Sequence, residues 1–584
     1  MIRRSAGVRV CLTAILTAAV TLGAGPGGGL RTITSDDLKE WLSYIASDEL
    51  EGRALFTSGS GLAAGYIESR VRAWGARPAG DRGSYLQTVR ILGVRAASRS
   101  SLTVEVDGQT RTFADGEGVT FPRLVGGKRR VAIDRVEFGG YGLDVPRAQH
   151  SDFAGKDVAG AAVVWLGSSP RSVDGSTYRV LLNARDRYAI DQLHASATIG
   201  PDTRRGGRGR AAAREATGAG GSNAPDEPAP QEGAAPDSPL RGRGDRIPAP
   251  DFTTVRRLDL AVPPSITAAD AFFEFLFSRA PMPYGELKRR AAAQEPLPTF
   301  RLDRVRLTFD LDADYEVVRT QTAHNVVAMI EGADPKLRDT FVVFGAHYDH
   351  VGYAEGEVVS DSSGTRRVGA PGLVRPGTES DRVWNGADDD GSGTVAVMAL
   401  AKAFAEGPRP RRSLLFVWHT GEERGLYGSR YFVDHPTVPL GNVMAQLNID
   451  MIGRNRDDRT SEADTVYLVG SDRISSELHA ISRAANDTLP RPLTLSYELN
   501  DPSDPEQLYF RSDHYSYASK GIPIIFFTTG LHPDYHTNAD EVSKIEFDKM
   551  TRIVQLIYET GWRLANLDHV VARDNKGARA TGAR

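Results

Sequence analysis

The feature that most constrains the fold is a series of short, nearly uninterrupted apolar runs in the second half of the chain. These runs are "NVVAMI", "TFVVFGAH", "SLLFVWHT", "VMAQLNID", "TVYLVG" and "IPIIFFTTG". Helical patterns such as "GTVAVMALAKAFAEG" and "RISSELHAISRAAND" lie between them. Strands of this kind alternating with helices predict an α/β fold with a mostly parallel sheet that helices cover on both faces.

The rest of the chain divides around this region. Leu38, Trp41, Leu42 and Ile45 are at helical spacing behind a Thr34/Ser35 cap, and short β-type runs with Gly turns begin near residue 119. We therefore predict one α/β domain that carries a small β-rich insertion. The predicted parts are a signal peptide (1–29), the N-terminal part of the α/β domain (34–118), the insertion (119–298) with a disordered Gly/Pro/Arg-rich loop (202–250), the main α/β part (299–567) and a disordered tail (568–584).

The N-terminus predicts export. Arg3 and Arg4 precede a short apolar run that closes in small residues, which is typical of a secretory signal with cleavage near Ala24. The destination is the periplasm or the medium. Cys11, the one cysteine of the chain, lies in this signal. The mature protein would then have no thiolate, so any metal must be held by His and carboxylate side chains.

Charge and hydropathy exclude two classes of partner. The formal net charge is -4 over 584 residues, which offers no broad basic field for nucleic acid. After the signal, no segment is long and apolar enough to span a membrane. The sequence predicts no particular oligomeric state.

The stretch "WHTGEERGLYGS" places Glu422 and Glu423 side by side directly after an apolar strand. Adjacent residues leaving a strand point in different directions, so one carboxylate can bind a cation while the other handles a proton. A solvated turn is the alternative, because surface Glu pairs are common. The residues at the ends of the other predicted strands help to decide between a metal site and a solvated turn.

Acidic and imidazole side chains stand where the predicted strands end. The groups are His347 and Asp349, Glu422 and Glu423, Asp450, His536, and the triplet Asp388, Asp389 and Asp390 just before a helix. Sites of open α/β sheets form at the carboxyl ends of the strands, so these groups should meet at one edge. They would repel one another unless cations lay among them.

Two metal ions fit this set better than one. His347, Asp389, Glu423, Asp450 and His536 supply enough ligands for two sites that share one carboxylate. Imidazole with carboxylate suits zinc, and cobalt or manganese are possible substitutes. Asp349 lies two residues after His347 and faces the same side, from which it can orient that imidazole.

Five motifs resemble those of the co-catalytic dizinc aminopeptidases, the family that includes glutamate carboxypeptidase and the transferrin receptor ectodomain. They are, in order, "GAHYDH", "NGADDDGSG", "GEERGLYGS", "NIDMIG" and "DYHTNADE". Each motif alone is weak, but five in order are specific. The resemblance implies a zinc exopeptidase-like fold, and the insertion is similar to the protease-associated domain that many members carry.

The resemblance also implies a role for each residue. Asp389 would bridge two zinc ions, of which one adds His347 and Asp450 and the other adds Glu423 and His536. Glu422 would be the general base that activates a metal-bound water. Tyr535 matches a tyrosine that stabilises the oxyanion in some members. The implied reaction is removal of N-terminal residues from peptides with a free N-terminus.

Other readings remain open. A carboxypeptidase or a one-zinc glutaminyl cyclase would keep this fold but change the reaction, and a receptor-like module would have lost ligands. His350 has no place in the two-metal scheme, and His532 is predicted to be a solvated loop residue. The loop over 351–386 is predicted to form a rim or lid over the site.

Overall fold

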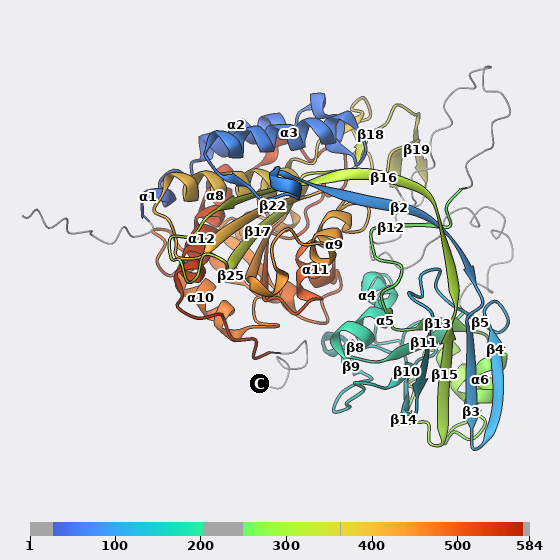
Figure 1. The fold of residues 1–584 in the computed structure, drawn as a ribbon. Helices are drawn as coiled ribbons and strands as arrows, with labels where there is room; N and C mark the ends of the chain where they lie inside the picture. The colour runs from blue at the N-terminus through green and yellow to red at the C-terminus, as the bar shows by residue number, and fades with distance from the viewer. Residues whose placement is uncertain (1–26, 203–248, 362–363, 576–584) are drawn as a thin grey trace, which may run out of the picture.

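The protein contains one large mixed sheet and a separate β-rich unit (Figure 1). The computed structural model describes residues 27–202, 249–361 and 364–575. The large sheet has 10 strands. Across the sheet they run β12 (Phe252–Thr254), β2 (Leu86–Ser98), β16 (Ala313–Ile330), β22 (Ser413–His419), β17 (Phe341–His347), β23 (Val443–Ile449), β26 (Ile524–Thr528), β24 (Thr465–Val469) and β25 (Thr494–Ser496), and β1 (Arg77–Pro78) pairs with β16.

The centre of this sheet is parallel. β22, β17, β23 and β26 pair in parallel, whereas β16 and β24 flank them in antiparallel orientation. All seven residues of β17, β22 and β23 are buried, which is why their sequences are continuous apolar runs. The predicted α/β class is confirmed, and the parallel part is its centre.

Helices cover both faces of the large sheet (Figure 1). On one face, alternate strand residues such as Val342, Phe344 and Phe416 pack in the same apolar cluster as the helices α2, α3, α8, α10 and α12. The intervening residues, such as Val343 and Val417, pack on the other face against α9 and α11. These helices are α2 (Ser35–Ile45), α3 (Ser58–Ala73), α8 (Gly393–Glu406), α9 (Tyr427–Asp434), α10 (Ser476–Asn486), α11 (His514–Ala518) and α12 (Phe547–Asn566).

The β-rich unit, called here the accessory unit, has its own apolar core. A six-stranded sheet runs β14 (Thr299–Arg301), β7 (Val136–Gly139), β10 (Ala162–Val164), β11 (Ala197–Pro201), β13 (Ser265–Ala268) and β5 (Val119–Thr120). A four-stranded sheet runs β4 (Gln109–Ala114), β3 (Ser101–Val106), β15 (Val305–Leu311) and β6 (Arg129–Ile133). The helices α6 (Asp270–Leu276) and α7 (Tyr284–Ala292) complete it.

A long antiparallel ribbon joins the two units (Figure 1). β2 pairs with β16 from Leu86↔Val326 to Ser98↔Ala313. β3 then pairs with β15 from Ser101↔Asp310 to Val106↔Val305. The accessory unit is therefore attached by two paired strands and not by a single linker, and β12 pairs with the outer edge of β2 from Phe252↔Val94 to Thr254↔Leu92.

The accessory unit extends beyond the predicted range of 119–298 on both sides. β3 and β4 precede residue 119 and β15 follows residue 298, and all three contribute to the accessory core. Sequence proximity to the N-terminal helices placed 101–114 with the α/β domain, whereas long-range pairing with β15 places it in the accessory unit.

Parts of the predicted termini and loop lie outside the described residues. These are 1–26 of the signal, 203–248 of the loop and 576–584 of the tail. The predicted tail begins too early, because residues up to Asn575 contact the α/β domain. The Arg412 side chain donates to the His569 carbonyl at 2.7 Å, and Asn575 N donates to the Ile474 carbonyl at 3.1 Å. None of the helices in the described residues combines the length and apolar character needed to cross a bilayer.

Candidate metal centre

The carboxyl ends of the central strands bring the predicted ligands to one cleft. His347 ends β17, Glu423 follows β22, Asp450 follows β23 and His536 follows β26. Asp389 lies in the loop before α8. The residues that bound this cleft are His347, Asp389, Glu422, Asp450, Met451, Leu508, Arg511, Ser512, Phe526, Thr528, Leu531, Tyr535 and His536.

Asp389 lies between two imidazoles. Its Oδ1 is 3.3 Å from His347 Nε2, and its Oδ2 is 3.0 Å from His536 Nε2. His347 Nε2 is also 3.7 Å from an oxygen of Asp450, and His536 Nε2 is 3.1 Å from an oxygen of Glu423. Each imidazole thus faces Asp389 and one further carboxylate, an arrangement that could hold two ions sharing Asp389.

The donor set fits metal ions. His347 is buried, and within the described residues its Nε2 has no hydrogen-bond partner although two carboxylates face it. A buried polar atom without a partner is costly, and so are buried carboxylates at such short separations. Divalent ions would satisfy the imidazole nitrogens and neutralise the carboxylates together.

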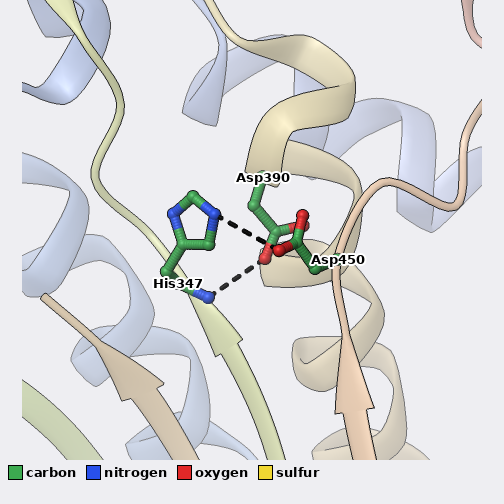
Figure 2. A group of neighbouring side chains, drawn as sticks. All are labelled: His347, Asp390 and Asp450. Carbon is green, nitrogen blue, oxygen red and sulfur yellow. Dashed lines mark hydrogen bonds and ion pairs between the residues drawn. The ribbon is translucent and has the colours of Figure 1, made fainter. Parts of the chain in front are cut away.

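Asp390 also lies near His347 and Asp450 (Figure 2), so these three residues form an alternative ligand group. The Asp390 carboxylate, however, already accepts hydrogen bonds from the backbone N–H groups of His347 at 3.0 Å, Gly393 at 2.9 Å and Met451 at 3.3 Å. These bonds fix the backbone beside the ligands His347 and Asp450. The Asp390 oxygens are thus engaged with backbone donors, whereas the Asp389 oxygens face two imidazoles, so Asp389 is the better candidate ligand.

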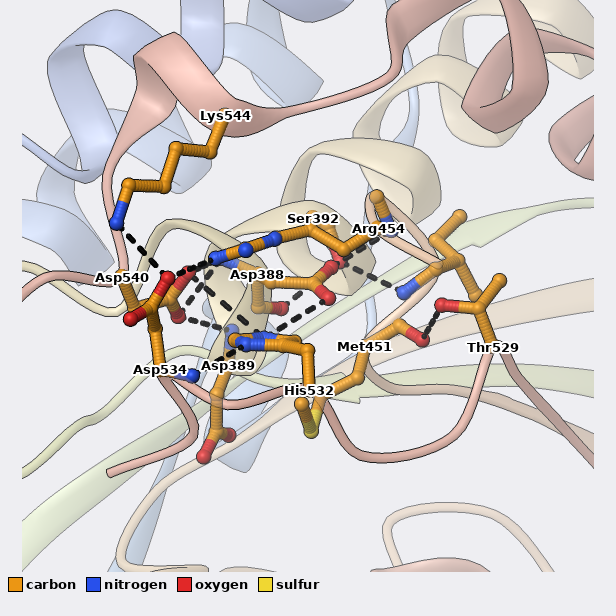
Figure 3. A network of polar contacts seen from close by, with 12 residues as sticks. Asp388, Asp389, Ser392, Met451, Arg454, Thr529, His532, Asp534, Asp540 and Lys544 are labelled. Atoms are coloured by element: carbon orange, nitrogen blue, oxygen red, sulfur yellow. Dashed lines mark hydrogen bonds and ion pairs between the residues drawn. The ribbon is translucent and has the colours of Figure 1, made fainter. Parts of the chain in front are cut away.

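Asp388 belongs to a separate polar network with His532 and Asp540 (Figure 3). One Asp388 oxygen accepts from Gly453 N at 2.6 Å, and the other is 3.4 Å from His532 Nε2. Asp540 accepts from the N–H groups of Asp388 and Asp389, each at 3.0 Å. The Asp389 carboxylate points away from this network in Figure 3. The network therefore holds the loop from which Asp389 reaches the metal centre.

The prediction that His532 is solvated is wrong. Its side chain is buried against Asp388. The sequence offered no sign of this contact, because the two residues are far apart in the chain. Its position four residues before His536, a predicted ligand, was the one sequence signal that it lies near the site.

The adjacent glutamates have opposite surroundings. Glu423 faces two imidazoles, since Oε1 is 2.8 Å from His350 Nδ1 and Oε2 is 3.1 Å from His536 Nε2. Burial alone would raise the pKa of Glu423, but His536 and His350 hold it below its usual value. Burial raises the pKa of Glu422 well above its usual value. The nearby His347 lowers this pKa in part, and the charge of Glu423 raises it further. Glu422 borders the cleft, and its backbone N–H donates to Asp349 Oδ1 at 3.2 Å.

Asp349 orients His347 mainly through its backbone. The His347 Nδ1 atom is 3.0 Å from the Asp349 carbonyl oxygen, whereas the Asp349 carboxylate is 3.8 Å away. The expected carboxylate contact is thus replaced by a carbonyl contact in this structure. The carboxylate instead receives the N–H of Glu422, which ties the strand end of His347 to the turn that carries Glu422.

The prediction from the sequence did not place His350 at the candidate metal centre. This buried residue contacts the second oxygen of Glu423, and His350, Asp389 and Glu423 form a group that could hold a metal ion. His350 Nδ1 lies 4.0 Å from Asp389, compared with 3.0 Å for His536 Nε2, so His536 is the better shared ligand. The signal that could have found it is its spacing, three residues after His347.

The loop after His350 also contacts the metal centre, but through the backbone. Leu373 N donates to the His536 carbonyl at 2.9 Å, and Asn538 N donates to the Leu373 carbonyl at 3.3 Å. None of the described residues of this loop is among those that bound the cleft. The predicted role as a rim or lid stays a prediction.

The segment that carries all five predicted ligands matches a family model. Residues 325–561 match the model described as peptidase family M28. The chain is similar to peptidase family M28. This confirms the resemblance expected from the five motifs.

Curated relatives of the M28-like segment carry peptidase names. The chain is 26% identical over 244 residues to leucine aminopeptidase 1 of Trichophyton equinum, which covers 40% of this chain and 56% of the relative. It is 27% identical over 273 residues to a probable zinc metalloprotease of Phaeosphaeria nodorum, covering 41% and 52%. The chain thus spans about half the length of these relatives.

Solved structures with a similar course of the chain include an aminopeptidase from Aneurinibacillus sp. strain AM-1. The TM-score is 0.42 with 16% identity, over 94% of this chain and 98% of the other. A zinc aminopeptidase from Bacillus subtilis gives a TM-score of 0.40 with 17% identity, over 93% and 99%.

Proposed function

We propose that the protein is a zinc-dependent aminopeptidase that binds two zinc ions per chain and removes N-terminal residues from peptides. The observation that carries this proposal is the division between the adjacent glutamates. Glu423 faces the imidazoles of His350 and His536, and Glu422 borders the cleft beside the ligands. The M28 match and the names of the relatives support the reaction class and the metal.

Five residues would hold the zinc pair. His347, Asp389 and Asp450 would bind one ion, and Asp389, Glu423 and His536 the other. When bound, such a pair polarises a carbonyl group and lowers the pKa of water.

In this proposal Glu422 transfers a proton from the attacking water to the leaving nitrogen. It takes one proton from the attacking water as the oxygen bonds to the scissile carbonyl carbon. It then gives that proton to the leaving nitrogen as the carbon–nitrogen bond breaks, which yields a free amino acid and the shortened peptide. Tyr535 borders the cleft and can donate its hydroxyl proton to the carbonyl oxygen as negative charge develops there.

The cleft favours an amino terminus over a carboxyl terminus. A carboxypeptidase needs a cation for the substrate carboxylate. Arg511 is the arginine among the residues that bound the cleft, and its guanidinium already contacts Glu506 at 2.8 Å and Tyr535 at 3.2 Å. The carboxylates of Glu422 and Asp450 border the same cleft and would attract a positively charged α-amino group.

The remaining alternatives fit less well. A one-zinc cyclase leaves unexplained why Asp389 faces an imidazole from each side. A binding module that has lost catalysis leaves unexplained why five ligands and Glu422 are all retained around one cleft.

A substrate panel with metal analysis tests the proposal. Aminoacyl nitroanilides, their N-blocked counterparts, peptides blocked only at the N-terminus, and peptides with N-terminal glutamine would be assayed with and without a chelator. We expect activity only on free amines, loss of activity with the chelator, and about two zinc ions per chain. Cleavage of N-blocked peptides from the C-terminus, cyclisation of glutamine, or one ion per active chain would contradict it.

We also propose that the protein is exported, on the basis of the N-terminal sequence alone. N-terminal sequencing of the mature protein from the periplasm or medium tests this. Retention of residues 1–24 in an active cytoplasmic form would contradict it.

A further inference from the structure

Arg511 occupies an unusual position in the wall of the cleft. Its side chain is 10% exposed and lies between Glu506 and Tyr535. The Nη1 atom donates to Glu506 Oε2 at 2.8 Å, and the Nη2 atom donates to the Tyr535 hydroxyl oxygen at 3.2 Å. The ion pair with Glu506 thus fixes the guanidinium that meets the tyrosine.

The chemistry of arginine sets the direction of this hydrogen bond. A guanidinium has N–H donors and no acceptor, so the Tyr535 oxygen must be the acceptor. The phenol proton cannot point toward Arg511. The bond from Arg511 occupies a lone pair of the hydroxyl oxygen and leaves its proton free to point elsewhere. Since Tyr535 borders the cleft, its proton remains available to an oxygen bound there.

The tyrosine ring is held on its other side as well. It stacks on the His536 ring at a centroid distance of 3.9 Å and an angle of 25°. Tyr535 N donates to the His532 carbonyl at 3.0 Å. Stacking fixes the plane of the ring, and Arg511 fixes the orientation of the hydroxyl. Donors that are oriented before the reaction stabilise developing charge without reorganisation.

We propose that Arg511, held by Glu506, is a positioning residue that directs the Tyr535 hydroxyl as a hydrogen-bond donor into the cleft. The proposal rests on the proposed peptidase function, because it assigns the recipient as the carbonyl oxygen of the scissile bond. It differs from two simpler roles for Arg511, a structural ion pair and a binding site for a substrate carboxylate.

A double-mutant cycle tests the proposal. Tyr535→Phe removes the donor and should lower kcat about 100- to 1,000-fold. Arg511→Met should lower kcat about 10- to 100-fold while KM changes little, because the lost interaction strengthens only in the transition state. In the Tyr535→Phe background, Arg511→Met should change kcat by less than about threefold, because its effect acts through the hydroxyl.

Two milder variants keep the test decisive if Arg511→Met folds poorly. Arg511→Lys retains a donor and should recover part of the kcat lost in Arg511→Met. Glu506→Gln weakens the hold on Arg511 and should lower kcat less than Arg511→Met does. Melting temperature and zinc content should match the wild type for both, since neither residue is a ligand.

Three results would overturn the proposal. One is an Arg511→Met variant with kcat within about twofold of wild type. Another is an equal loss in the Tyr535→Phe background, which indicates a purely structural role. The third is a raised KM for peptides with a free carboxylate at unchanged kcat, which indicates carboxylate binding. Failure of the proposed function is distinguishable, because then wild type itself would show no chelator-sensitive aminopeptidase activity.

Discussion

Some buried carboxylates of the α/β domain have oxygens without hydrogen-bond partners, in contrast to Asp152 of the accessory unit. In the accessory unit, Asp152 is buried, but one of its oxygens accepts from Tyr141 N and Leu143 N, each at 3.0 Å, and also contacts His150. In the α/β domain, the buried carboxylates of Asp349 and Asp513 keep oxygens without a hydrogen-bond partner among the described residues. A satisfied buried acid stabilises a fold, whereas unsatisfied acids gathered at one sheet edge indicate a site that binds something else.

The largest expected effect separates proton transfer from metal binding inside the α/β domain. Glu422→Gln keeps the shape and hydrogen bonding of the side chain but cannot accept a proton, so kcat should fall about 100- to 10,000-fold. Zinc content and melting temperature should stay at the wild-type values. Glu423→Gln is the matched control, and it should weaken zinc binding first and lose activity as a consequence.

Steady-state kinetics with metal analysis on both variants checks this prediction. A Glu422→Gln variant with two zinc ions and more than about a tenth of wild-type kcat would show that another group is the base.

The next largest effect is expected on the free energy of unfolding of the accessory unit, with no change in catalysis. Phe138 is buried and packs against Phe277 and Phe300, each at a ring distance of 5.2 Å. Phe138→Ala should lower the free energy of unfolding of this unit by about 3–5 kcal/mol. Calorimetry should show an earlier transition for the accessory unit, with kcat unchanged below that temperature.

The matched control for Phe138→Ala is Phe344→Ala, because Phe344 is buried in the α/β domain and stacks on Phe416 at 5.3 Å. It should lower the transition in which activity is lost. If Phe138→Ala removes activity at the same temperature as Phe344→Ala, the two units unfold as one and the comparison fails.

A smaller effect is expected where the two units touch beside the cleft. Arg187 of the accessory unit donates to the Phe510 carbonyl at 3.4 Å and lies 5.1 Å from the centre of the Phe510 ring. The neighbouring Leu508 and Arg511 border the cleft. Arg187→Met removes one hydrogen bond and one cation–π contact, of about 1 kcal/mol each at most, so kcat/KM should fall by less than about 30-fold.

Arg147→Ala is the control for this contact. Arg147 pairs with Asp501 at 3.3 Å at the same interface, but both side chains are more than a third exposed. Its loss should leave kcat/KM within about twofold of wild type. If Arg187→Met and Arg147→Ala lower kcat/KM equally, then any contact between the two units affects kcat/KM, and the specific support of the cleft wall by Arg187 does not.

The smallest effect is expected from the Gly/Pro/Arg-rich segment. Deletion of residues 203–248 should leave solubility, melting temperature and kcat near the wild-type values, because this composition offers little apolar surface to bury. Expression of the deletion variant beside the full chain checks this. Insoluble protein would show that the accessory unit depends on the segment.

The sequence predicted those parts of the molecule in which local pattern and tertiary role agree. β17, β22 and β23 are continuous apolar runs because helices cover both faces of the sheet. The α/β class could therefore be predicted from the sequence alone. Four of the five proposed ligands end or follow strands of the parallel centre, which brings them together, and Asp389 joins them from the loop before α8. The bridging role of Asp389, the middle residue of its triplet, came from the resemblance.

Contacts between distant segments could not be predicted in this way. The burial of His532 depends on Asp388, and the hold on Asp389 depends on Asp540. The strand β3 alternates like any half-buried strand, and only its pairing with β15 and with β4 places β3 and β4 in the accessory unit. A single sequence carries the pattern of each strand but not the identity of its neighbour.

The paired ribbon of β2 and β16 has a practical consequence for protein engineering. A domain attached by one flexible linker can reorient freely, whereas two hydrogen-bonded strands behave as a stiff stem that fixes direction as well as distance. The stem ends at Ser98 and Ala313, which are paired neighbours and so are separated by about the usual spacing between strands, near 4.8 Å. A tight hairpin turn, or any other domain whose termini leave side by side as antiparallel strands, could be joined at this point. The α/β domain is in this sense a scaffold to which other binding units can be joined in a direction that the ribbon sets.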